Sequence, residues 1–319
     1  MKKSLEDVSN PHRQYVFIVG PTASGKSAVA LPLAQKLSAP IINTDSIQIY
    51  KDINIGSAKP SYAEMKLHPH YLFDFVDLNT TYTAADYVTS VQDLLWKENF
   101  DKALFVGGSG FYIQALQKGM FPNVKTPLEV KTELEAWIDR EGFQSLWDWL
   151  KQVDPTAANK LSPNDHYRVR RAVEIMKTQD LTLTQLREEV ATGKYAPLPP
   201  HQRLNLGLRA DKDQLRERVR VRTQKMLDLG FVGEVEHLIQ EGYEHSSALQ
   251  SVGYKEVQMF LGGEIAKQDL FERIVTSTMQ LIKKQMTWFS RDPSIEWFEL
   301  GCEQELIERA MTWSKGTSS

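Results

Sequence analysis

The first residues in the chain with evident chemistry form a phosphate-binding pattern. Gly20, Gly25, Lys26 and Ser27 satisfy G-x-x-x-x-G-K-[ST]. In such a loop the glycines let backbone N–H groups close on phosphate oxygens, and the lysine neutralises their charge. The serine hydroxyl is placed to bind Mg²⁺. The sequence therefore predicts a bound phosphate group, held by Gly20, Pro21, Thr22, Ala23, Ser24, Gly25, Lys26 and Ser27.

The elements that must position this loop can be found on both sides of it. The apolar run Tyr15–Val19 supplies the preceding strand, and helix signals cover Lys26–Leu37. Pro40–Asn43 and Ala103–Val106 are further predicted strands, with a helix over about Ala84–Trp96 between them. Strands that alternate with helices and end on glycines indicate a parallel sheet with right-handed crossovers. This context argues against the alternative, a glycine-rich turn that binds nothing.

The middle of the chain is predicted to be helical throughout. Helices are expected at Pro127–Ile138, Phe143–Gln152, Asp165–Lys177 and Leu183–Glu188, and the prolines of Tyr195–Arg203 then interrupt regular structure. The predicted fold is α/β, a P-loop NTPase-like parallel sheet flanked by helices, with an all-helical insertion domain. The expected core domain comprises residues 12–122 and 203–319, and the expected insertion comprises residues 123–202.

The last third returns to the core domain. Leu204–Leu208 alternates like a strand, and Ile295–Leu300 could supply a late strand. Asp211 is the expected N-cap of an arginine-rich helix that runs to Leu229 and stops at Gly230.

One feature of a nucleoside triphosphatase is missing. Such enzymes have an acidic residue that closes a later apolar strand and holds magnesium. Here the best later strand closes on Gly107 and Gly108, and Asp74 lies in a weaker strand candidate after Pro69. The loop is therefore expected to hold phosphates other than those of ATP.

The composition is that of an ordinary soluble globular protein. The chain has 319 residues, a formal net charge of −3 and a single cysteine, Cys302. A binding site for nucleic acid would therefore have to come from local basic patches. An internal disulfide and a cysteine-based zinc finger are excluded. No apolar run near the amino end suits a signal peptide or a membrane span, so we expect a cytoplasmic monomer without a membrane partner.

Longer strings are far more specific than the phosphate loop alone. They are "GPTASGKS", "NTDSIQIYKDINIGSAKP", "VGGSGFYIQAL", "NDHYRVRRAVEI", "RVRTQKMLDLGFVGEV", "QSVGYKE" and "KKQMTWFSRD". In these strings the chain closely resembles the bacterial tRNA dimethylallyltransferase (tRNA isopentenyltransferase) family, and the resemblance extends from about Tyr15 to Arg291.

The resemblance implies a prenyl transfer to RNA. Members of this family move a dimethylallyl group from dimethylallyl diphosphate to N6 of the adenosine 3′ of the anticodon. That adenosine is position 37 of tRNAs that read codons beginning with U. The phosphates held by the loop would then be the diphosphate leaving group, with Mg²⁺ as cofactor.

The resemblance also implies catalytic roles. Asp45 matches the family's general base, although the residue alone would favour a helix N-cap or a group that holds magnesium only indirectly, outside its direct ligands. Lys26 and Arg222 would stabilise the departing diphosphate, with Arg218 as a weaker candidate on the same helical face. Ser109 stands where family members commonly have threonine, and its hydroxyl could bind the diphosphate or the reacting N6.

The target adenosine must be extruded from the anticodon loop before N6 can react. Ser46 and Gln48 would offer it hydrogen bonds, and Tyr167 could stack where the family often has glutamine. The contacts to tRNA implied by the matching strings are Asp45, Ser46, Ile47, Gln48, Tyr167, Arg168, Arg171, Gln250, Ser251, Val252, Gly253, Tyr254, Lys283, Lys284, Gln285 and Arg291. Ser290 replaces an arginine that is common there.

Structural interpretations of some of these residues stand beside the functional ones. Tyr254, Trp288 and Phe289 have helical spacing among apolar residues, which is typical of a packed core. His68 and His70 are interpreted as ordinary loop histidines, because no acidic or cysteine partner lies at ligand spacing.

Three other functions are compatible with parts of the sequence. An adenylate isopentenyltransferase would act on free AMP, which needs no helical insertion. A small-molecule or nucleotide kinase would use the phosphate loop alone. A non-catalytic RNA-binding regulator would use the loop as a nucleotide sensor.

Overall fold

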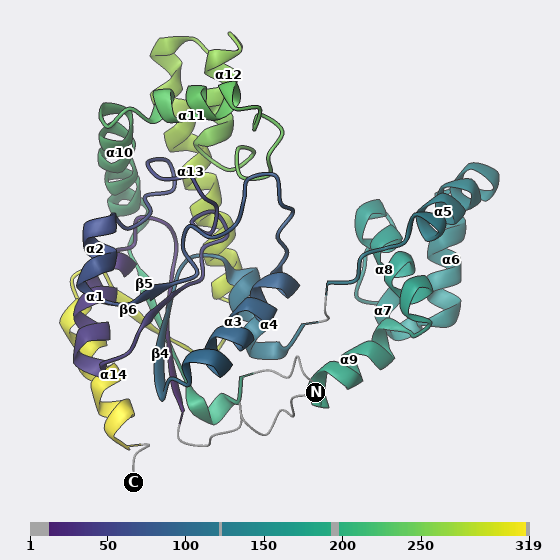
Figure 1. The fold of residues 1–319 in the computed structure, drawn as a ribbon, viewed down its shortest axis with the longest axis horizontal. Coiled ribbons are helices and arrows are strands. Elements are labelled where there is room, and N and C mark those ends of the chain that lie inside the picture. The colour runs from purple at the N-terminus through teal and green to yellow at the C-terminus, as the bar shows by residue number, and fades with distance from the viewer. Residues whose placement is uncertain (1–12, 121–122, 193–197, 317–319) are drawn as a thin grey trace. The chain divides into compact units, whose positions relative to one another are not determined.

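The computed structural model describes residues 13–120, 123–192 and 198–316, which form two compact units (Figure 1). The sheet unit contains residues 13–82, 90–114 and 199–316, and the helical unit contains residues 83–89 and 115–198. The predicted domain limits at residues 12, 122 and 319, and Tyr195–Pro197 of the proline-rich segment, lie outside the described residues. The helical unit includes residues 83–89 and 115–120, which the predicted insertion does not contain, and residues 199–202 of that insertion belong to the sheet unit.

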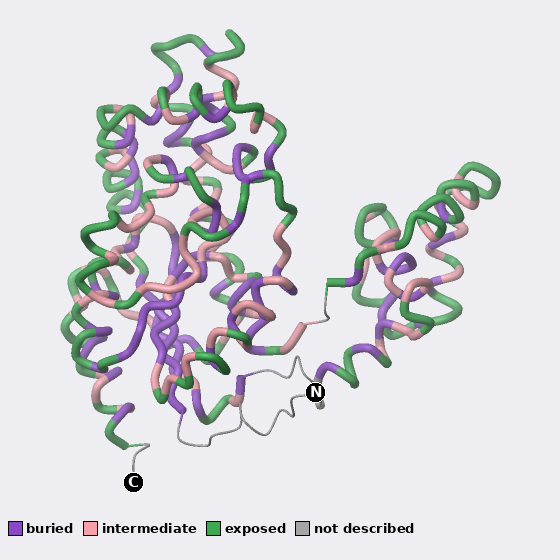
Figure 2. Tube along the Cα trace, in the orientation of Figure 1, coloured by how far each residue is buried: buried purple, intermediate pink, exposed green. Residues whose placement is uncertain are grey.

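The sheet unit is built on a six-stranded parallel sheet in the order β3-β2-β4-β1-β5-β6. Its strands are β1 (Gln14–Val19), β2 (Ile41–Asn43), β3 (His70–Tyr71), β4 (Lys102–Val106), β5 (Arg203–Arg209) and β6 (Ile295–Glu299). Val16 pairs with Leu104 on one side and with Leu204 on the other, so β1 is central and buried along its length (Figure 2). The predicted parallel α/β sheet is confirmed. Of the two-residue β3, His70 was expected in a loop, and Tyr71 lies in the weaker strand candidate after Pro69.

Helices cover this sheet and extend beyond it. α1 (Lys26–Leu37) and α14 (Glu303–Gly316) share one apolar cluster with the strands, in which Leu33, Leu206 and Leu306 are fully buried. α2 is Tyr62–Leu67, and α3 (Ala84–Glu98) and α4 (Gly110–Lys118) belong partly to each unit. No described helix is long and apolar enough to cross a bilayer.

The carboxyl third of the sheet unit contributes four more helices. They are α10 (Lys212–Asp228), α11 (Phe231–Gln240), α12 (Tyr254–Leu261) and α13 (Lys267–Phe289). Asp211 caps α10 by accepting from the amides of Asp213 and Gln214, as predicted. α11, α12 and α13 pack with Ile49 and Ile53 in a second apolar cluster, which anchors the segment that follows β2.

The helical unit has its own core. α5 (Leu128–Glu141), α6 (Phe143–Val153), α7 (Pro155–Ala158), α8 (His166–Gln179) and α9 (Leu183–Thr192) bury an apolar cluster that contains Leu134, Leu146, Leu150, Val169 and Val173. The four predicted helices are confirmed, and the described residues of this unit contain no strand. The one-turn α7 was not predicted. Beyond this unit, the proline cluster ends in a 3-10 turn at Pro200–Gln202.

Asp154 joins two helices of this unit through a buried carboxylate. Its Oδ1 accepts from the amide of Ala157 at 3.0 Å and the hydroxyl of Thr184 at 2.7 Å, and its Oδ2 accepts from the amide of Thr184 at 2.9 Å. Burial raises the pKa of Asp154, but the hydrogen bonds from Thr184 and Ala157 outweigh it, so the pKa lies below its ordinary value.

We expect Asp154→Ala to lower the free energy of unfolding by about 1–3 kcal/mol at pH 7. A carboxylate whose pKa is lowered by folding stabilises above its unfolded pKa, and that stabilisation is lost as the pH falls through the folded pKa. The difference between wild type and variant should therefore shrink on acidification from about pH 5 to pH 2, measured by denaturant unfolding. Asp148→Ala, at an exposed site on α6, is the control and should stay within about 0.5 kcal/mol. A deficit that does not change with pH would contradict this role.

Candidate active site

The phosphate loop follows β1 at the carboxyl edge of the sheet. Gly20 has φ 145°, and a Cβ there would lie 2.3 Å from the carbonyl oxygen of Leu208 on β5. Gly25, with φ 98°, begins α1. Glycine is therefore required at both positions, by backbone conformation and, at Gly20, by the close approach of the neighbouring strand.

Lys26 lies inside this loop. Its Nζ donates to the carbonyl oxygens of Gly20 at 2.9 Å and Pro21 at 2.7 Å. Burial lowers the pKa of Lys26 to about 8, with Asp45 opposing this shift and the positive charge of Arg222 adding to it. Asp45 therefore compensates the positive charge of the ammonium group only in part. A bound anion would favour the charged form of Lys26.

Asp45 is held in one orientation by the backbone around it. Asn43, fully buried at the end of β2, accepts from the amide of Asp45 at 2.8 Å and donates to its carbonyl oxygen at 3.0 Å. The Oδ1 of Asp45 accepts from the amides of Ile47 at 2.9 Å and Gln48 at 3.4 Å. Residues 46–49 form a turn and no helix begins at Asp45, so the helix N-cap that the residue alone suggested is not formed. Its Oδ1 instead closes this turn, while the carboxylate also lines the cavity at the phosphate loop.

Arg222 and Arg218 reach the same loop from α10. Arg222 donates to the hydroxyl of Thr22 at 3.2 Å, and Arg218 donates to the carbonyl oxygen of Ala23 at 2.7 Å. Burial lowers the pKa of Arg222, and the charge of Asp45 opposes that shift. The two predicted arginines therefore do share one face of the helix, and that face points at the phosphate loop.

Ser109 lies on the opposite side of the loop, directly before α4. Its Oγ accepts from the amide of Ser46 at 2.9 Å and donates to the hydroxyl of Ser46 at 3.0 Å. Ser109 thus fixes the residue next to Asp45, and its role toward a substrate stays a prediction.

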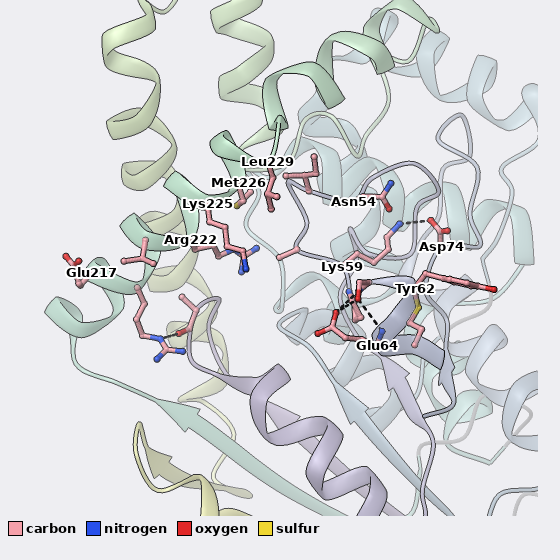
Figure 3. Close-up of a pocket in the computed structure, with 18 residues that line it drawn as sticks. Asn54, Lys59, Tyr62, Glu64, Asp74, Glu217, Arg222, Lys225, Met226 and Leu229 are labelled. Atoms are coloured by element: carbon pink, nitrogen blue, oxygen red, sulfur yellow. Dashed lines mark hydrogen bonds and ion pairs between the residues drawn. The ribbon is translucent and has the colours of Figure 1, made fainter. Parts of the chain in front are cut away.

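Most of these groups line two adjoining cavities in the sheet unit, but Ser109 is not part of the wall of either one. One, of about 580 Å³, is lined by Lys26, Ser27, Asp45, Gly107 and Arg222 among others. The second, of about 910 Å³, lies between α10 and the segment from Asn54 to Met65. Figure 3 shows the labelled residues of α10 on one side of this cavity, with Tyr62 and Glu64 of α2 on the other. Arg218, Arg222 and Lys225 belong to the walls of both, so the cavities meet at a row of cations.

Two glutamines predicted to contact RNA hold loops together in this structure. Gln285 of α13 accepts from the amide of Thr22 at 2.9 Å and donates to the carbonyl oxygen of Gly108 at 3.0 Å, so it joins the phosphate loop to the end of β4. Gln48 donates to the carbonyl oxygens of Ser57 and Ala58 at 3.0 and 3.2 Å.

The aromatic residues divide differently from the prediction. Tyr254 and Phe289 are buried in the core, as their spacing predicted. The predicted direct contact between the Tyr254 side chain and tRNA is therefore wrong, because Tyr254 is 0% exposed and its hydroxyl donates to Glu234. Trp288 was expected in the core and is instead 38% exposed, packed edge-on against Phe111.

The remaining predicted tRNA contacts lie in three places. Ser46 and Ile47 are beside Asp45. In the carboxyl-terminal third Gly253 is buried, and the other predicted contacts are partly or fully exposed: Gln250, Ser251, Val252, Lys283, Lys284 and Arg291. In the helical unit, Tyr167 is 79% exposed and Arg168 pairs with Asp165. Arg171 instead donates within the unit, to Thr126, Glu174 and the carbonyl oxygen of Val124.

Sequence reasoning gave no role to three residues that shape the site. Lys59, only 3% exposed, donates to the carbonyl oxygen of Tyr50 and to Asp74. Asn43 and Glu234 orient backbone segments. Asn43 and Lys59 lie inside the motif string that begins at Asn43, but their roles become evident only from the hydrogen bonds that they make in the folded structure. His68 and His70 contact backbone carbonyl oxygens of Ala39 and His68, and His70 lies in β3.

A family model described as IPP transferase matches residues 48–292. The chain belongs to the IPP transferase family. The family predicted from the motif strings is therefore confirmed, and with it the class of activity, a transferase.

Individual relatives match over nearly the whole length. The chain is 41% identical over 290 residues to a tRNA dimethylallyltransferase of Bdellovibrio bacteriovorus, covering 90% of this chain and 93% of the relative. A tRNA isopentenylpyrophosphate transferase of Bacillus halodurans superposes with a TM-score of 0.68 at 28% identity, covering 96% and 98% of the two chains. A eukaryotic dimethylallyltransferase acting on tRNA superposes with a TM-score of 0.77 at 25% identity, covering 94% and 78%. These structures support the P-loop-like sheet of this IPP transferase.

The lowered pKa of Lys26 predicts pH-dependent binding of inorganic diphosphate. Below pH 8 the lysine is charged in the free protein, and above pH 8 it must take up a proton to bind the anion. We expect the affinity of the wild type to fall about tenfold between pH 7 and pH 9 relative to Lys26→Met, measured by calorimetry. Diphosphate also titrates in this pH range, but it does so equally for both proteins, so the ratio of the two affinities reports Lys26 alone. Parallel pH profiles for the two proteins would contradict the shifted lysine.

Proposed function

We propose that the protein is a tRNA dimethylallyltransferase. It transfers the dimethylallyl group of dimethylallyl diphosphate to N6 of adenosine 37, next to the anticodon, in tRNAs that read codons beginning with U. The observation that carries this proposal is one 580 Å³ cavity whose wall contains both the carboxylate of Asp45 and the cations Lys26 and Arg222. The names of the relatives and the motif strings support the choice of tRNA over free AMP.

The diphosphate end of the donor would occupy the phosphate loop. Loop amides, Lys26 and Arg222 would hold its oxygens, and Arg218 would add charge from the same helix. These groups favour the state in which negative charge grows on the leaving oxygen, because they are already in place before the bond breaks.

Mg²⁺ fits this arrangement. Ser27 exposes a hydroxyl in the first turn of α1 and lines the same cavity as Asp45, which is an oxygen-rich environment of the kind magnesium prefers. Among the described residues no cluster of three His, Cys, Asp or Glu could hold a metal alone. The ion would supply additional charge neutralisation to the diphosphate, whose oxygens would complete its ligand set.

The reaction then exchanges one bond for another at carbon. The N6 lone pair attacks C1 of the dimethylallyl group, the C1–O bond breaks, and its electron pair leaves with the diphosphate. The proton from N6 passes to Asp45. The amides of Ile47 and Gln48 fix the orientation of that carboxylate through Oδ1, so it can accept the proton without first reorienting.

We expect Asp45→Asn to reduce prenyl transfer about a hundred- to ten-thousand-fold. Asparagine keeps an oxygen for the amides of Ile47 and Gln48, so the fold should be retained while the base is lost. Asp52→Asn, an exposed site on the same segment, is the matched control and should remain active. The assay is mass spectrometry of nucleosides from hypomodified tRNA incubated with enzyme, dimethylallyl diphosphate and Mg²⁺.

The same assay separates the competing functions. Prenylated AMP without modified tRNA would indicate an adenylate isopentenyltransferase. Phosphate transfer from ATP, with indifference to dimethylallyl diphosphate, would indicate a kinase. Binding of tRNA without either reaction would indicate an RNA-binding regulator.

Arg168 and Arg171 were both predicted to contact tRNA, but their different contacts lead us to expect different effects when each is replaced by alanine. Arg168→Ala should raise KM for tRNA about fivefold and weaken its salt dependence, because an exposed cation meets phosphate, with the melting temperature unchanged. Arg171→Ala should lower the melting temperature by a few degrees, since it removes three hydrogen bonds inside the helical unit. Equal effects of the two variants on stability would contradict this division.

A further inference from the structure

We propose that Glu234 of α11 is a positioning residue that holds the loop of residues 54–60 where that loop fixes Arg222 and Gln48. The inference rests on the proposed function, in which Arg222 stabilises the departing diphosphate. Glu234 itself contacts neither the phosphate loop nor Asp45. It acts through the backbone of the 54–60 loop.

Four donors converge on this one carboxylate. Its Oε2 accepts from the amides of Asn54 at 3.2 Å and Ile55 at 2.7 Å. Its Oε1 accepts from the amide of Gly56 at 3.2 Å and from the hydroxyl of Tyr254 at 2.6 Å. Three successive amides that point at one anion form a concave anion site, and hydrogen bonds to a carboxylate are stronger than neutral ones. The loop is thereby fixed to α11 at three consecutive residues.

Packing fixes the same loop from the other side. A Cβ on Gly56 would lie 2.2 Å from the ring of Phe231 and 2.5 Å from the ring of Tyr254. Both rings are fully buried and meet edge-on at 4.9 Å between centroids. The backbone of Gly56 can lie this close to them only because it carries no side chain.

The far end of the loop reaches the candidate active site. The carbonyl oxygen of Ser57 accepts from Gln48 at 3.0 Å and from Arg222 at 3.5 Å, and that of Ala58 accepts from Gln48 at 3.2 Å. Ala58 and Lys59 line both cavities, and Figure 3 shows Lys59 directed toward Asp74 across the loop.

The loop has little regular structure of its own to keep it in place. Residues 53–60 form turns without a strand or helix, closed by the amides of Ala58 and Lys59 to the carbonyl oxygens of Ile55 and Asn54. Without the Glu234 carboxylate, three amides would lose their acceptor, and the two carbonyl groups that orient Gln48 and Arg222 would lose their fixed position.

The test is Glu234→Gln, which keeps the size of the side chain but places an NH₂ group against donors. We expect faster hydrogen exchange in peptides that cover residues 54–58. We also expect kcat for prenyl transfer to fall about tenfold, with KM for tRNA changed less than twofold and the protein still folded. Glu236→Gln makes the same chemical change at an exposed position two residues along α11 and should match the wild type in all three measurements.

Gly56→Ala tests the loop without touching Glu234. The added methyl must push the loop away from Phe231 and Tyr254, so it should reproduce the fall in kcat while Glu234 is intact. Faster exchange with wild-type kcat in both folded variants would overturn the positioning role. So would unchanged exchange in Glu234→Gln.

These outcomes differ from a failure of the proposed function. If the wild type transfers no dimethylallyl group, the proposed function fails, and Glu234 is then judged by affinity for inorganic diphosphate, which depends on Arg222. A several-fold loss in Glu234→Gln and Gly56→Ala, but not in Glu236→Gln, would still support positioning. Equal affinities in all three would overturn it.

Discussion

The site depends on keeping several cations close together around one short loop. Lys26 and Arg222 are both partly buried at this loop, and Asp45 is the acidic group whose charge offsets both. Burial is the main cause that lowers the pKa values of Lys26 and Arg222, and the charge of Arg222 adds to the shift of Lys26. An anion in the phosphate loop would stabilise both charged groups, so the arrangement favours a diphosphate over a neutral ligand. The rest of the sheet unit can be understood as the scaffold that holds these charges together in the absence of such an anion.

That scaffold comes from segments far apart in the sequence. α10 and α13 pack through Leu215, Val219, Val275 and Ile282, with Ala23 of the phosphate loop against them. This packing lets α10 present Arg218 and Arg222 while α13 supplies Gln285 to the same loop. The central place of β1 in the sheet puts that loop beside the ends of both β4 and β5. Chemistry at the carboxyl edge of the sheet therefore depends on helices that close around it.

The sequence predicted what local patterns determine. β1, α1 and the helices α5, α6, α8 and α9 follow from local apolar and helical patterns, and the motif strings placed Asp45, Lys26 and Arg222 around one site. The tasks of Gln285 and Glu234 could not be predicted, because each depends on backbone groups from a segment distant in sequence. Gln48 bonds the backbone of Ser57 and Ala58, which lies near it in sequence but in a loop whose course no pattern predicts. A polar side chain looks the same in a sequence whether it faces RNA or a carbonyl oxygen. The exposure of Trp288 was missed for a similar reason, since helical spacing does not show which face of α13 is covered.

The glycines that close β4 stand where a nucleoside triphosphatase has an acidic residue. A Cβ on Gly107 would lie 2.4 Å from Thr44 Oγ1, and one on Gly108 would lie 2.5 Å from Gln285 Nε2. A carboxylate at either position, where a nucleoside triphosphatase holds magnesium, would displace the β2 end or the glutamine that joins two loops. In the proposed reaction, cations from α10 would instead neutralise the departing diphosphate. The packing that brings Gln285 to the loop thus leaves no room at these glycines for the acidic group of a kinase, which agrees with the proposed cleavage of the C–O bond.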